Sequence, residues 1–476
     1  MSQTQTITID PVTRLEGHGK ITIQLNGKGE VEDAHFHITQ VRGFERFSQG
    51  RPFYEMPSLM ARICGICPVS HLLASAKACE AIMSVQIPHT AAQLRRTLNL
   101  AQMVQSHALS FFHLSSPDLL LGMDSDPASR HILGVAAANP KLGLAGIALR
   151  RFGQNIIELL GGKRVHPGWV VPGGVTEPLT AEKRDKILAM IPEAYANVGL
   201  ALAAYMQIAD KFKAEIEVFA NFPSNYMSLI NEDESFEITD GALRLIDAKG
   251  KTIEDGMTAS RFTEAIGEAV EPYSYTKFPY YKALGYPEGS YRVGPLARLN
   301  IVKTMGTPQA DKELAGFKKL ATGPVESSFH QHHARLVEAL YGIEKIEEIL
   351  ADPKILDKHV RATAGVNRLE GAGQIEAPRG TLNHYYKVDE DGKITWANLI
   401  VATGHNNNAM NKGVLQAAKA YVKDGKFTEG ALNRIEAVVR TFDPCLSCST
   451  HAFGQMPLAV TLLSADGEVV DRVVRG

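Results

Sequence analysis

Four of the five cysteines in this chain form two Cys-x-x-Cys pairs near opposite ends of the sequence, Cys64/Cys67 and Cys445/Cys448. Two intervening residues allow both thiolates of a pair to face one metal ion. A single pair is typical of redox, zinc and iron–sulfur sites alike, whereas two pairs in one chain predict a four-thiolate metal site. Five cysteines in 476 residues are too few for a disulfide scaffold.

The remaining residues limit the chemistry that this site can do alone. Once four cysteines are used only Cys79 is left, so the chain has too few thiols for an additional iron–sulfur cluster bound by four cysteines. The sequence also lacks a Gly-x-Gly-x-x-Gly dinucleotide fingerprint after a predicted strand. If the site does redox chemistry, its electrons must therefore leave through another polypeptide. A structural zinc tetrathiolate, which is closed and inert, is the alternative.

The elements expected to bring the two pairs together are mainly long helices. Apolar residues at steps of three and four from Leu94 to Phe111 indicate an amphipathic helix. Further helices are predicted over 140–160, over 180–222 with a kink at Pro192, and over 327–350. Alternating apolar runs and turn residues predict strand pairs at 21–25 with 31–39, 385–388 with 395–401, and 458–463 with 469–474.

Composition excludes several classes of protein. The chain is 45% hydrophobic and 21% charged with a net charge of -2, which argues against a disordered chain and against a basic nucleic-acid binder. The uncharged run 194–209 is too short to span a bilayer and predicts a buried helix. Residues 1–10 are polar, without the apolar core of a signal peptide, so we expect a cytoplasmic protein without a membrane span.

Because the cysteine pairs lie near the two ends, we expect one α-rich α+β domain with a long-helix bundle core and small peripheral β-sheets.

Longer runs around the cysteines resemble the large, catalytic subunit of nickel–iron hydrogenases over almost the whole chain. The runs that carry this resemblance are Arg14-Leu-Glu-Gly-His18, Arg42-Gly-Phe-Glu45, Arg62-Ile-Cys-Gly-Ile-Cys-Pro-Val-Ser-His71, Ala377-Pro-Arg-Gly380 and Asp443-Pro-Cys-Leu-Ser-Cys-Ser-Thr-His451. The resemblance implies the hydrogenase large-subunit fold. Within that family, the bidirectional NAD(P)-linked subgroup is resembled by the runs 106–118, 277–281 and 291–298.

The resemblance implies a Ni-Fe(CN)2(CO) centre that oxidises H2 reversibly by heterolytic cleavage. All four cysteines would bind nickel, Cys64 and Cys445 as terminal ligands and Cys67 and Cys448 as bridges to iron. Soft thiolates suit electron-rich nickel and iron. Cys445 would be the first base, and Glu16 matches the next proton acceptor, since burial can bring a carboxylate pKa toward neutrality. An alternative gives Arg379 the role of first base.

Five further residues match positions around this centre. Arg379 would lie over the exposed face of the metals and hydrogen-bond a cyanide, and Thr403 matches a second position beside the cyanides. His71 follows Cys67 by four residues, so it shares a helical face with it and would donate to a bridging sulfur. Asp443 and Asp118 resemble carboxylates that orient Arg379.

The resemblance also implies a magnesium site and a maturation step. Glu45, the carbonyl of Leu399 and His451 would bind Mg²⁺, which prefers oxygen-rich, hydrated coordination. A dedicated protease in this family cuts after the residue matching His451, so residues 1–451 would be the mature domain and 452–476 a C-terminal maturation extension.

The resemblance implies several protein partners. They are an iron–sulfur small subunit, diaphorase subunits with FMN and an NAD(P) site, nickel-insertion chaperones and the maturation protease. The final electron acceptor stays open among NAD, NADP and a ferredoxin. Two non-enzymatic alternatives also stay open: a catalytically silent subunit like the quinone-binding subunit of respiratory complex I, and a zinc-stapled structural subunit.

Overall fold

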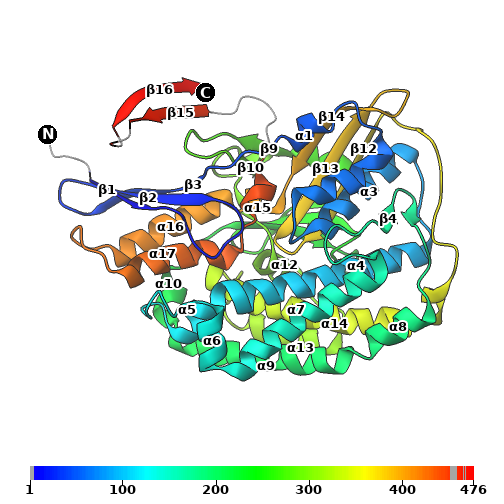
Figure 1. Cartoon of the computed structure of the whole chain (residues 1–476), viewed down its shortest axis with the longest axis horizontal. Helices are drawn as coiled ribbons and strands as arrows, with labels where there is room; N and C mark the ends of the chain where they lie inside the picture. Colours follow the sequence, from blue (N-terminus) through cyan, green and yellow to red (C-terminus); the bar gives the residue numbers. More distant parts are fainter. Residues whose placement is uncertain (1–4, 451–457, 465, 467, 476) are drawn as a thin grey trace.

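The computed structural model describes residues 5–450, 458–464, 466 and 468–475. Four long helices form the base of the molecule (Figure 1): α4 (His89–Ala108), α7 (Pro140–Gly161), α9 (Ile191–Lys211) and α14 (Gln331–Ala351). Helix α4 packs against α7 and α14, and α9 packs against the same two helices. The main hydrophobic core runs through this bundle and continues into the helices and sheets above it, and the predicted α-rich α+β class is confirmed.

The predicted helix over 180–222 is three helices, α8 (Ala181–Leu188), α9 and α10 (Lys213–Val218). The prediction of a kink at Pro192 was wrong, because this proline lies in the first turn of α9, where its missing N–H costs no helical hydrogen bond. The expectation of a buried helix over 194–209 holds for one face only, since Met206 is 55% exposed. By length and hydropathy the combined run Ala181–Lys211 meets the criterion for a membrane span, but a core helix with one buried face meets it too.

Two three-stranded antiparallel sheets lie above the bundle. β1 (Gln5–Ile9), β2 (Gly19–Leu25) and β3 (Val31–Ile38) form the first, with β3 packed on α16 (Asn407–Tyr421). β12 (Glu370–Ala377), β13 (Gly380–Val388) and β14 (Ile394–Ile400) form the second, with β12 packed on α3 (Pro68–Met83). The predicted hairpins 21–39 and 385–401 are confirmed as β2–β3 and β13–β14.

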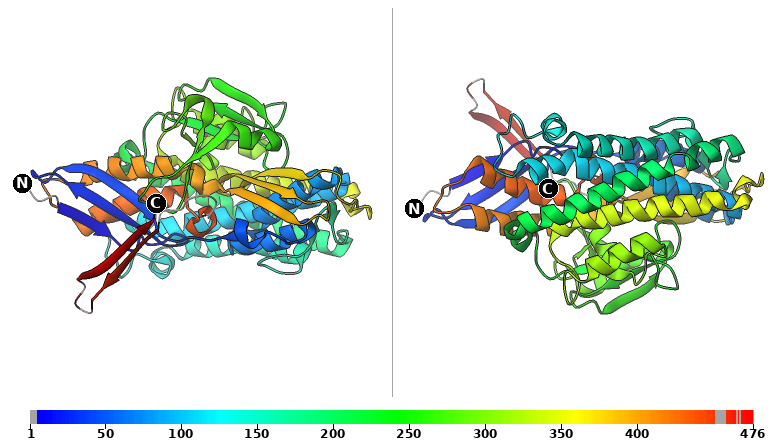
Figure 2. Two further views of the ribbon diagram at one scale, coloured as in Figure 1. Left: turned by 90° about the horizontal axis from the view of Figure 1, so that it is seen from above. Right: turned by 90° about the horizontal axis from the view of Figure 1, so that it is seen from below.

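A third sheet projects from the side of the bundle (green in Figure 2) and has its own small apolar core. It consists of β6 (Asn225–Ile230), β7 (Ala242–Ile246), β8 (Thr252–Met257) and β11 (Tyr291–Arg292), in the order β11-β6-β7-β8. The hairpin of β15 (Leu458–Leu463) and β16 (Val469–Arg475) confirms the strand pair predicted near the C-terminus.

The remaining elements are short, apart from α13 and α17. The helices are α1 (Phe44–Phe47), α2 (Met56–Met60), α5 (Ser116–Leu121), α6 (Ile132–Ala138), α11 (Ala259–Ala265), α12 (Pro295–Ile301), α13 (Pro308–Lys318), α15 (Ala402–His405), α17 (Glu429–Phe442) and α18 (Leu446–Ser449). The strands are β4 (Val170–Val171), β5 (Gly174–Val175), β9 (Ile266–Ala269) and β10 (Phe278–Tyr281). A π-helical segment, Leu109–Ser115, joins α4 to α5, so the helix predicted through Phe111 ends as an α-helix at Ala108.

Candidate metal centre

The two cysteine pairs, 381 positions apart in the sequence, converge in the interior. All four sulfur atoms lie within 4.8 Å of one another, and all four residues are buried. The distance is 3.5 Å from Cys64 Sγ to Cys445 Sγ, 3.8 Å from Cys67 Sγ to Cys448 Sγ, and 2.7 Å from Cys445 Sγ to Cys448 Sγ. The predicted convergence of the pairs is therefore confirmed.

Each pair lies at the entrance of a helix. Cys67 precedes Pro68, the first residue of α3, and Cys445 precedes α18. The backbone N–H groups of Ile66 and Cys67 donate to Cys64 Sγ at 3.2 and 3.1 Å. Free N–H groups at helix entrances stabilise thiolates, so these positions suit metal-binding cysteines.

The four thiols cannot all ionise in this volume without a positive charge nearby. Burial raises the pKa of Cys445 and Cys448, whereas hydrogen bonds from the neighbouring thiols, led by Cys445, lower the pKa of Cys67. Buried anions need cationic partners, and a divalent metal bound by all four sulfurs meets that need. The donor set therefore fits a soft transition metal.

Arg379 lies beside the sulfurs and lines the same small cavity as Cys67 and Cys445. Its Nε donates to the backbone oxygen of Asp443 at 2.5 Å and its Nη2 to Asp443 Oδ1 at 3.1 Å. Burial acts against the charged guanidinium, but Asp443 and the cysteines outweigh it and keep the pKa of Arg379 above its usual value. Its Nη1 has no partner among the described residues, so a buried donor is left for a bound group.

Arg298, a residue of α12, hydrogen-bonds the backbone directly before Arg379. Arg298 donates to the carbonyl oxygens of Ala377 and Pro378 at 3.0 and 3.1 Å. It also pairs with Glu338 at 2.7 Å and with Glu376 at 2.6 Å, and all three side chains are completely buried. Arg298 was not assigned to the site from the sequence, although it ends the 291–298 run.

Replacing Arg298 with alanine is expected to lower the free energy of unfolding by about 3–5 kcal/mol, because Glu338 and Glu376 would stay buried without their cation. Chemical denaturation of the variant measures this change. Lys186→Ala, which breaks an exposed ion pair with Glu182, is the control and should change stability by less than about 1 kcal/mol. Equal, small changes for both variants would contradict the assignment.

Glu16 reaches the cysteines from the N-terminal segment. Its Oε2 accepts a hydrogen bond from Cys445 Sγ at 3.0 Å and another from the backbone N–H of Ser447 at 3.1 Å, and the Ser447 hydroxyl donates to its Oε1. Its backbone carbonyl accepts from Leu446 N at 3.0 Å. A half-buried carboxylate thus lies within proton-transfer distance of one thiol.

Two further predicted residues also lie at the cavity. Thr403 Oγ1 accepts from the backbone N–H of Cys445 at 2.9 Å. His71 lies next to Cys67, whose pKa it helps to lower, and its Nδ1 is 3.2 Å from His384 Nε2. His71 Nε2 makes no hydrogen bond within the described chain. His384 was missed in the sequence, because nothing in a β-strand pattern distinguishes a buried histidine that supports another histidine.

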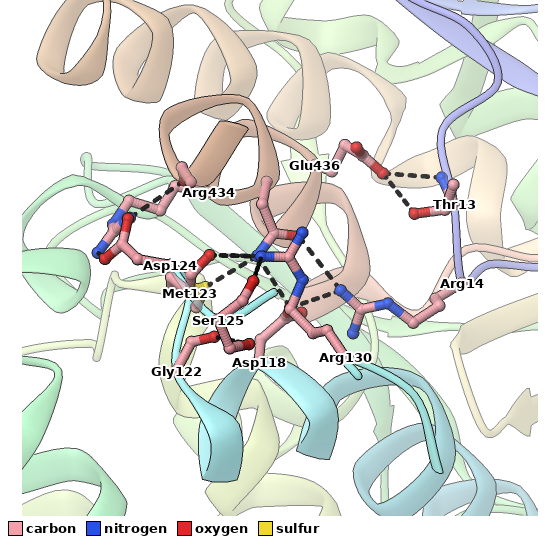
Figure 3. Close-up of polar contacts among 12 residues, drawn as sticks. Thr13, Arg14, Asp118, Gly122, Met123, Asp124, Ser125, Arg130, Arg434 and Glu436 are labelled. Atoms are coloured by element: carbon pink, nitrogen blue, oxygen red, sulfur yellow. Dashed lines mark hydrogen bonds and ion pairs between the residues drawn. The ribbon is translucent and has the colours of Figure 1, made fainter. Parts of the chain in front are cut away.

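The prediction that Asp118 orients Arg379 is not met. In the part of the chain that the structure describes, no hydrogen bond or ion pair joins the two side chains. Asp118 instead pairs with Arg14 at 2.5 Å (Figure 3) and with Arg440 at 3.1 Å. The reason is geometric: α5 places this carboxylate against α17 and the N-terminal segment, while Asp443 forms both of the side-chain hydrogen bonds that Arg379 makes among the described residues.

Two of the three residues predicted to bind magnesium lie together. Glu45 is buried, and its Oε1 accepts a hydrogen bond from the backbone N–H of Leu399 at 2.7 Å. His451, the third predicted residue, lies outside the described residues. The structure therefore brings Glu45 and the Leu399 backbone together.

The chain matches the family model of nickel-dependent hydrogenases over residues 42–128 and 144–451, and a model described as HoxL-like over residues 6–41. It is 42% identical to the NAD-reducing hydrogenase HoxS subunit beta of Cupriavidus necator, covering 98% of this chain and 99% of that protein. It is 40% identical to a subunit of the F420-non-reducing hydrogenase vhc of Methanococcus voltae, over 97% of this chain and 98% of that one.

Solved structures show the same relationship. The fold superposes on a crystal structure of an NAD+-reducing NiFe-hydrogenase in the H2-reduced state with a TM-score of 0.91 and 44% identity, over 94% of this chain and all of that one. A NiFeSe hydrogenase of Desulfovibrio vulgaris Hildenborough matches with a TM-score of 0.76 and 27% identity, again over 94% of this chain and all of that one. The chain therefore belongs to the large-subunit family of nickel-dependent hydrogenases. It is a hydrogenase subunit with a buried group of four cysteines that suits a metal ion.

Proposed function

We propose that this chain catalyses reversible H2 oxidation and proton reduction at a Ni-Fe(CN)2(CO) centre. The observation that carries the proposal is the buried group of four cysteine sulfurs within 4.8 Å, in a chain of the nickel-dependent hydrogenase family. Cys64 and Cys445 would hold nickel as terminal ligands, and Cys67 and Cys448 would bridge nickel and iron. When bound, this metal pair supplies the site at which H2 is cleaved heterolytically.

The protein's own residues handle the proton. The Cys445 thiol donates to Glu16 Oε2, so a proton held on that sulfur has an acceptor 3.0 Å away. The hydroxyl and backbone N–H of Ser447 hold the same carboxylate in place. The alternative first base, Arg379, has a pKa held above its usual value and stays protonated, which favours Cys445 over Arg379 in this role.

Three residues are proposed to surround the iron ligands. Arg379 offers its unpartnered Nη1 as a donor to a cyanide, Thr403 lines the same cavity, and His71 lies beside the bridging Cys67. Asp443 orients Arg379 by its two hydrogen bonds. Glu45, the Leu399 carbonyl and His451 are proposed to bind Mg²⁺; the support is the burial of Glu45 against the backbone of Leu399.

Electrons are proposed to pass to a small iron–sulfur subunit, then to diaphorase subunits that carry FMN and bind NAD(P). The support is that Cys79 is the only cysteine left in this chain, and that the relative from Cupriavidus necator is the beta subunit of an NAD-reducing hydrogenase. We also propose that nickel-insertion chaperones load the site and that the assembled enzyme is cytoplasmic.

Metal analysis of the purified enzyme tests the function. We expect nickel and iron at about one each per chain, with H2-dependent reduction of NAD or NADP when the partner subunits co-purify. Zinc as the sole metal would establish the zinc-stapled alternative, and a metal-free, stable protein would establish the silent one.

Residues 452–476 are proposed to be a maturation extension that is removed after His451. The solved NAD+-reducing NiFe-hydrogenase chain aligns over its whole length with 94% of this chain. The part of this chain that stays unmatched is about as long as these 25 residues. The described part of the extension is the β15–β16 hairpin, in which Leu462, Val470 and Val473 are exposed. Exposed aliphatic side chains on a small hairpin suit a segment that is recognised and then discarded.

The intact mass of the active enzyme is therefore expected to be that of residues 1–451, lower than the full chain by the 25 residues. Mass spectrometry of nickel-loaded protein measures this, and nickel-free protein from cells grown without nickel is the control that should keep the extension. Active, nickel-loaded protein that still carries 452–476 would refute the maturation step.

A further inference from the structure

A cluster of buried charges ties the N-terminal segment to α17, directly before the second cysteine pair. We call Arg14, Asp118, Asn433 and Arg440 the Asp118 cluster. Asp118 Oδ1 accepts from Arg14 at 2.5 Å and from Asn433 at 3.0 Å, and its Oδ2 accepts from Arg440 at 3.1 Å. Asn433 Oδ1 in turn accepts from both arginines, at 3.2 and 2.8 Å. Every member thus contacts several of the others.

The cluster reaches the segment that carries Glu16. Arg440 donates from Nε to the carbonyl oxygen of Thr13 at 2.9 Å and from Nη2 to Thr13 Oγ1 at 3.0 Å. Glu436 accepts at 2.8 Å from both the backbone N–H and the hydroxyl of Thr13 (Figure 3). Thr13, three residues before Glu16, is therefore hydrogen-bonded to α17 through its backbone N–H, its backbone carbonyl and its side chain.

The backbone between Thr13 and Glu16 adopts a conformation that needs support. Arg14 has φ of 57°, in the left-handed region that residues with a side chain seldom occupy. Such a conformation is strained and persists where the surrounding contacts determine it. Arg14 is held there because its guanidinium bonds Asp118 and the carbonyl oxygen of Leu114 at 2.8 Å.

The charges of the cluster favour this arrangement. Burial acts against ionisation of Asp118, but Arg440 and Arg14 outweigh it and hold the pKa of this carboxyl below its usual value. Burial lowers the pKa of Arg440, and Asp118 opposes that effect. Asp118 is thus the anion that allows two arginines to converge on one segment in the interior.

We propose that Asp118 is a positioning residue for Glu16: by holding Arg440 and Arg14 against residues 13–14, it sets the position of the Glu16 carboxylate at Cys445 Sγ. The inference rests on the proposed function, in which Glu16 accepts the proton. It differs from a role in orienting Arg379, whose hydrogen bonds in the described part of the chain go to Asp443. Asp118 itself makes no contact with the cysteines among the described residues.

Asp118→Asn in the complete enzyme tests the proposal, because the amide keeps the shape of the side chain and removes the charge. We expect nickel and iron content to be unchanged and H2/D2O exchange to fall on the order of 10- to 100-fold, the loss typical of misplacing a reacting group by about 1 Å. Asp124→Asn is the matched control: Asp124 pairs with Arg434 of α17 at 2.6 Å (Figure 3), and no hydrogen bond or ion pair joins it to the described residues 13–16. The exchange rate of the Asp124→Asn enzyme should stay within about twofold of the wild-type rate, since exposed ion pairs contribute little to stability.

Double variants show which residue Asp118 acts through. In a Glu16→Gln background, Asp118→Asn should cause no further loss of exchange, whereas in an Arg379→Lys background the two losses should multiply. The reverse pattern would overturn the proposal and assign Asp118 to Arg379. Wild-type enzyme without nickel or exchange would refute the proposed function itself, whereas active wild type with a fully active Asp118→Asn variant would refute the positioning role alone.

Thr13→Val keeps the proposal falsifiable if Asp118→Asn does not load metal. Thr13 is exposed, so this nearly isosteric change should leave folding intact while removing the hydroxyl that bonds Arg440 and Glu436. The loss of these bonds is expected to lower exchange about fivefold, the rate equivalent of about 1 kcal/mol. Unchanged exchange in the metal-loaded Thr13→Val variant would overturn the proposal.

Discussion

Glu16→Gln is expected to keep nickel and iron and to lower H2/D2O exchange on the order of 10²- to 10⁴-fold, the usual contribution of a positioned acid or base. The amide oxygen can still accept from the Ser447 N–H, so the fold around α18 is preserved, but glutamine cannot take the proton from Cys445 Sγ. Exchange measured by mass spectrometry, together with metal content, separates loss of proton transfer from loss of the metals.

Glu30→Gln is the matched control for this variant. Glu30 is an exposed carboxylate beside the same N-terminal sheet, hydrogen-bonded to Asn26 and far in sequence from the residues that line the cavity. Its exchange rate should equal that of wild type. A metal-loaded Glu16→Gln enzyme with undiminished exchange would remove Glu16 from the proton path.

Cys448→Ser is expected to reduce nickel and iron from about one each per chain to less than about a tenth. The hydroxyl matches the thiol in shape but offers a hard oxygen that stays protonated at neutral pH, and nickel and iron in this setting require soft thiolates. Because Cys448 lies 3.8 Å from Cys67 and 2.7 Å from Cys445, its loss removes a donor from the centre of the group. Metal analysis of the purified variant measures the effect, and we expect no H2-dependent activity.

The chain supplies its own control in Cys79. This fifth cysteine is buried in α3, its thiol donates to the carbonyl oxygen of Phe53 at 3.1 Å, and burial raises its pKa well above the usual value. Cys79→Ser should keep both metals, since a protonated thiol outside the group of four binds neither. Equal metal loss in Cys79→Ser and Cys448→Ser would show that loading depends on folding rather than on the ligands.

The sequence by itself determined the ligand type of the shared metal site and the type of several secondary-structure elements. Residue type and short spacing decide whether two thiolates can face one ion, so the Cys-x-x-Cys pairs predicted a shared metal site before any fold was known. Apolar periodicity likewise predicted α14 and the β13–β14 hairpin, because each of these patterns is complete within a few turns or residues.

Some elements could not be predicted from the sequence, because their residue pattern is set by the element that packs against them. β12 contains Gly371 and Gly373 and lacks the usual apolar alternation; a side chain at either position would meet the backbone of α3, 2.3 Å from Ala78 O and 2.1 Å from Ala74 O. Close packing of a strand on a helix thus requires residues that look like a loop. Pro192 was misread for a related reason, since the same residue bends a helix or begins one depending on where the helix starts.

Only the tertiary structure decided the partners of the charged residues around the centre. Asp118 was assigned to Arg379 from its place in a run, but it bonds Arg14 and Arg440, which lie 104 positions before it and 322 positions after it. Arg298, which holds the carbonyls before Arg379, shows no local feature that distinguishes it from any other helical arginine. The type of each side chain is known from the sequence. The partner of a buried charge, in contrast, depends on which elements pack around that charge and exclude water from it.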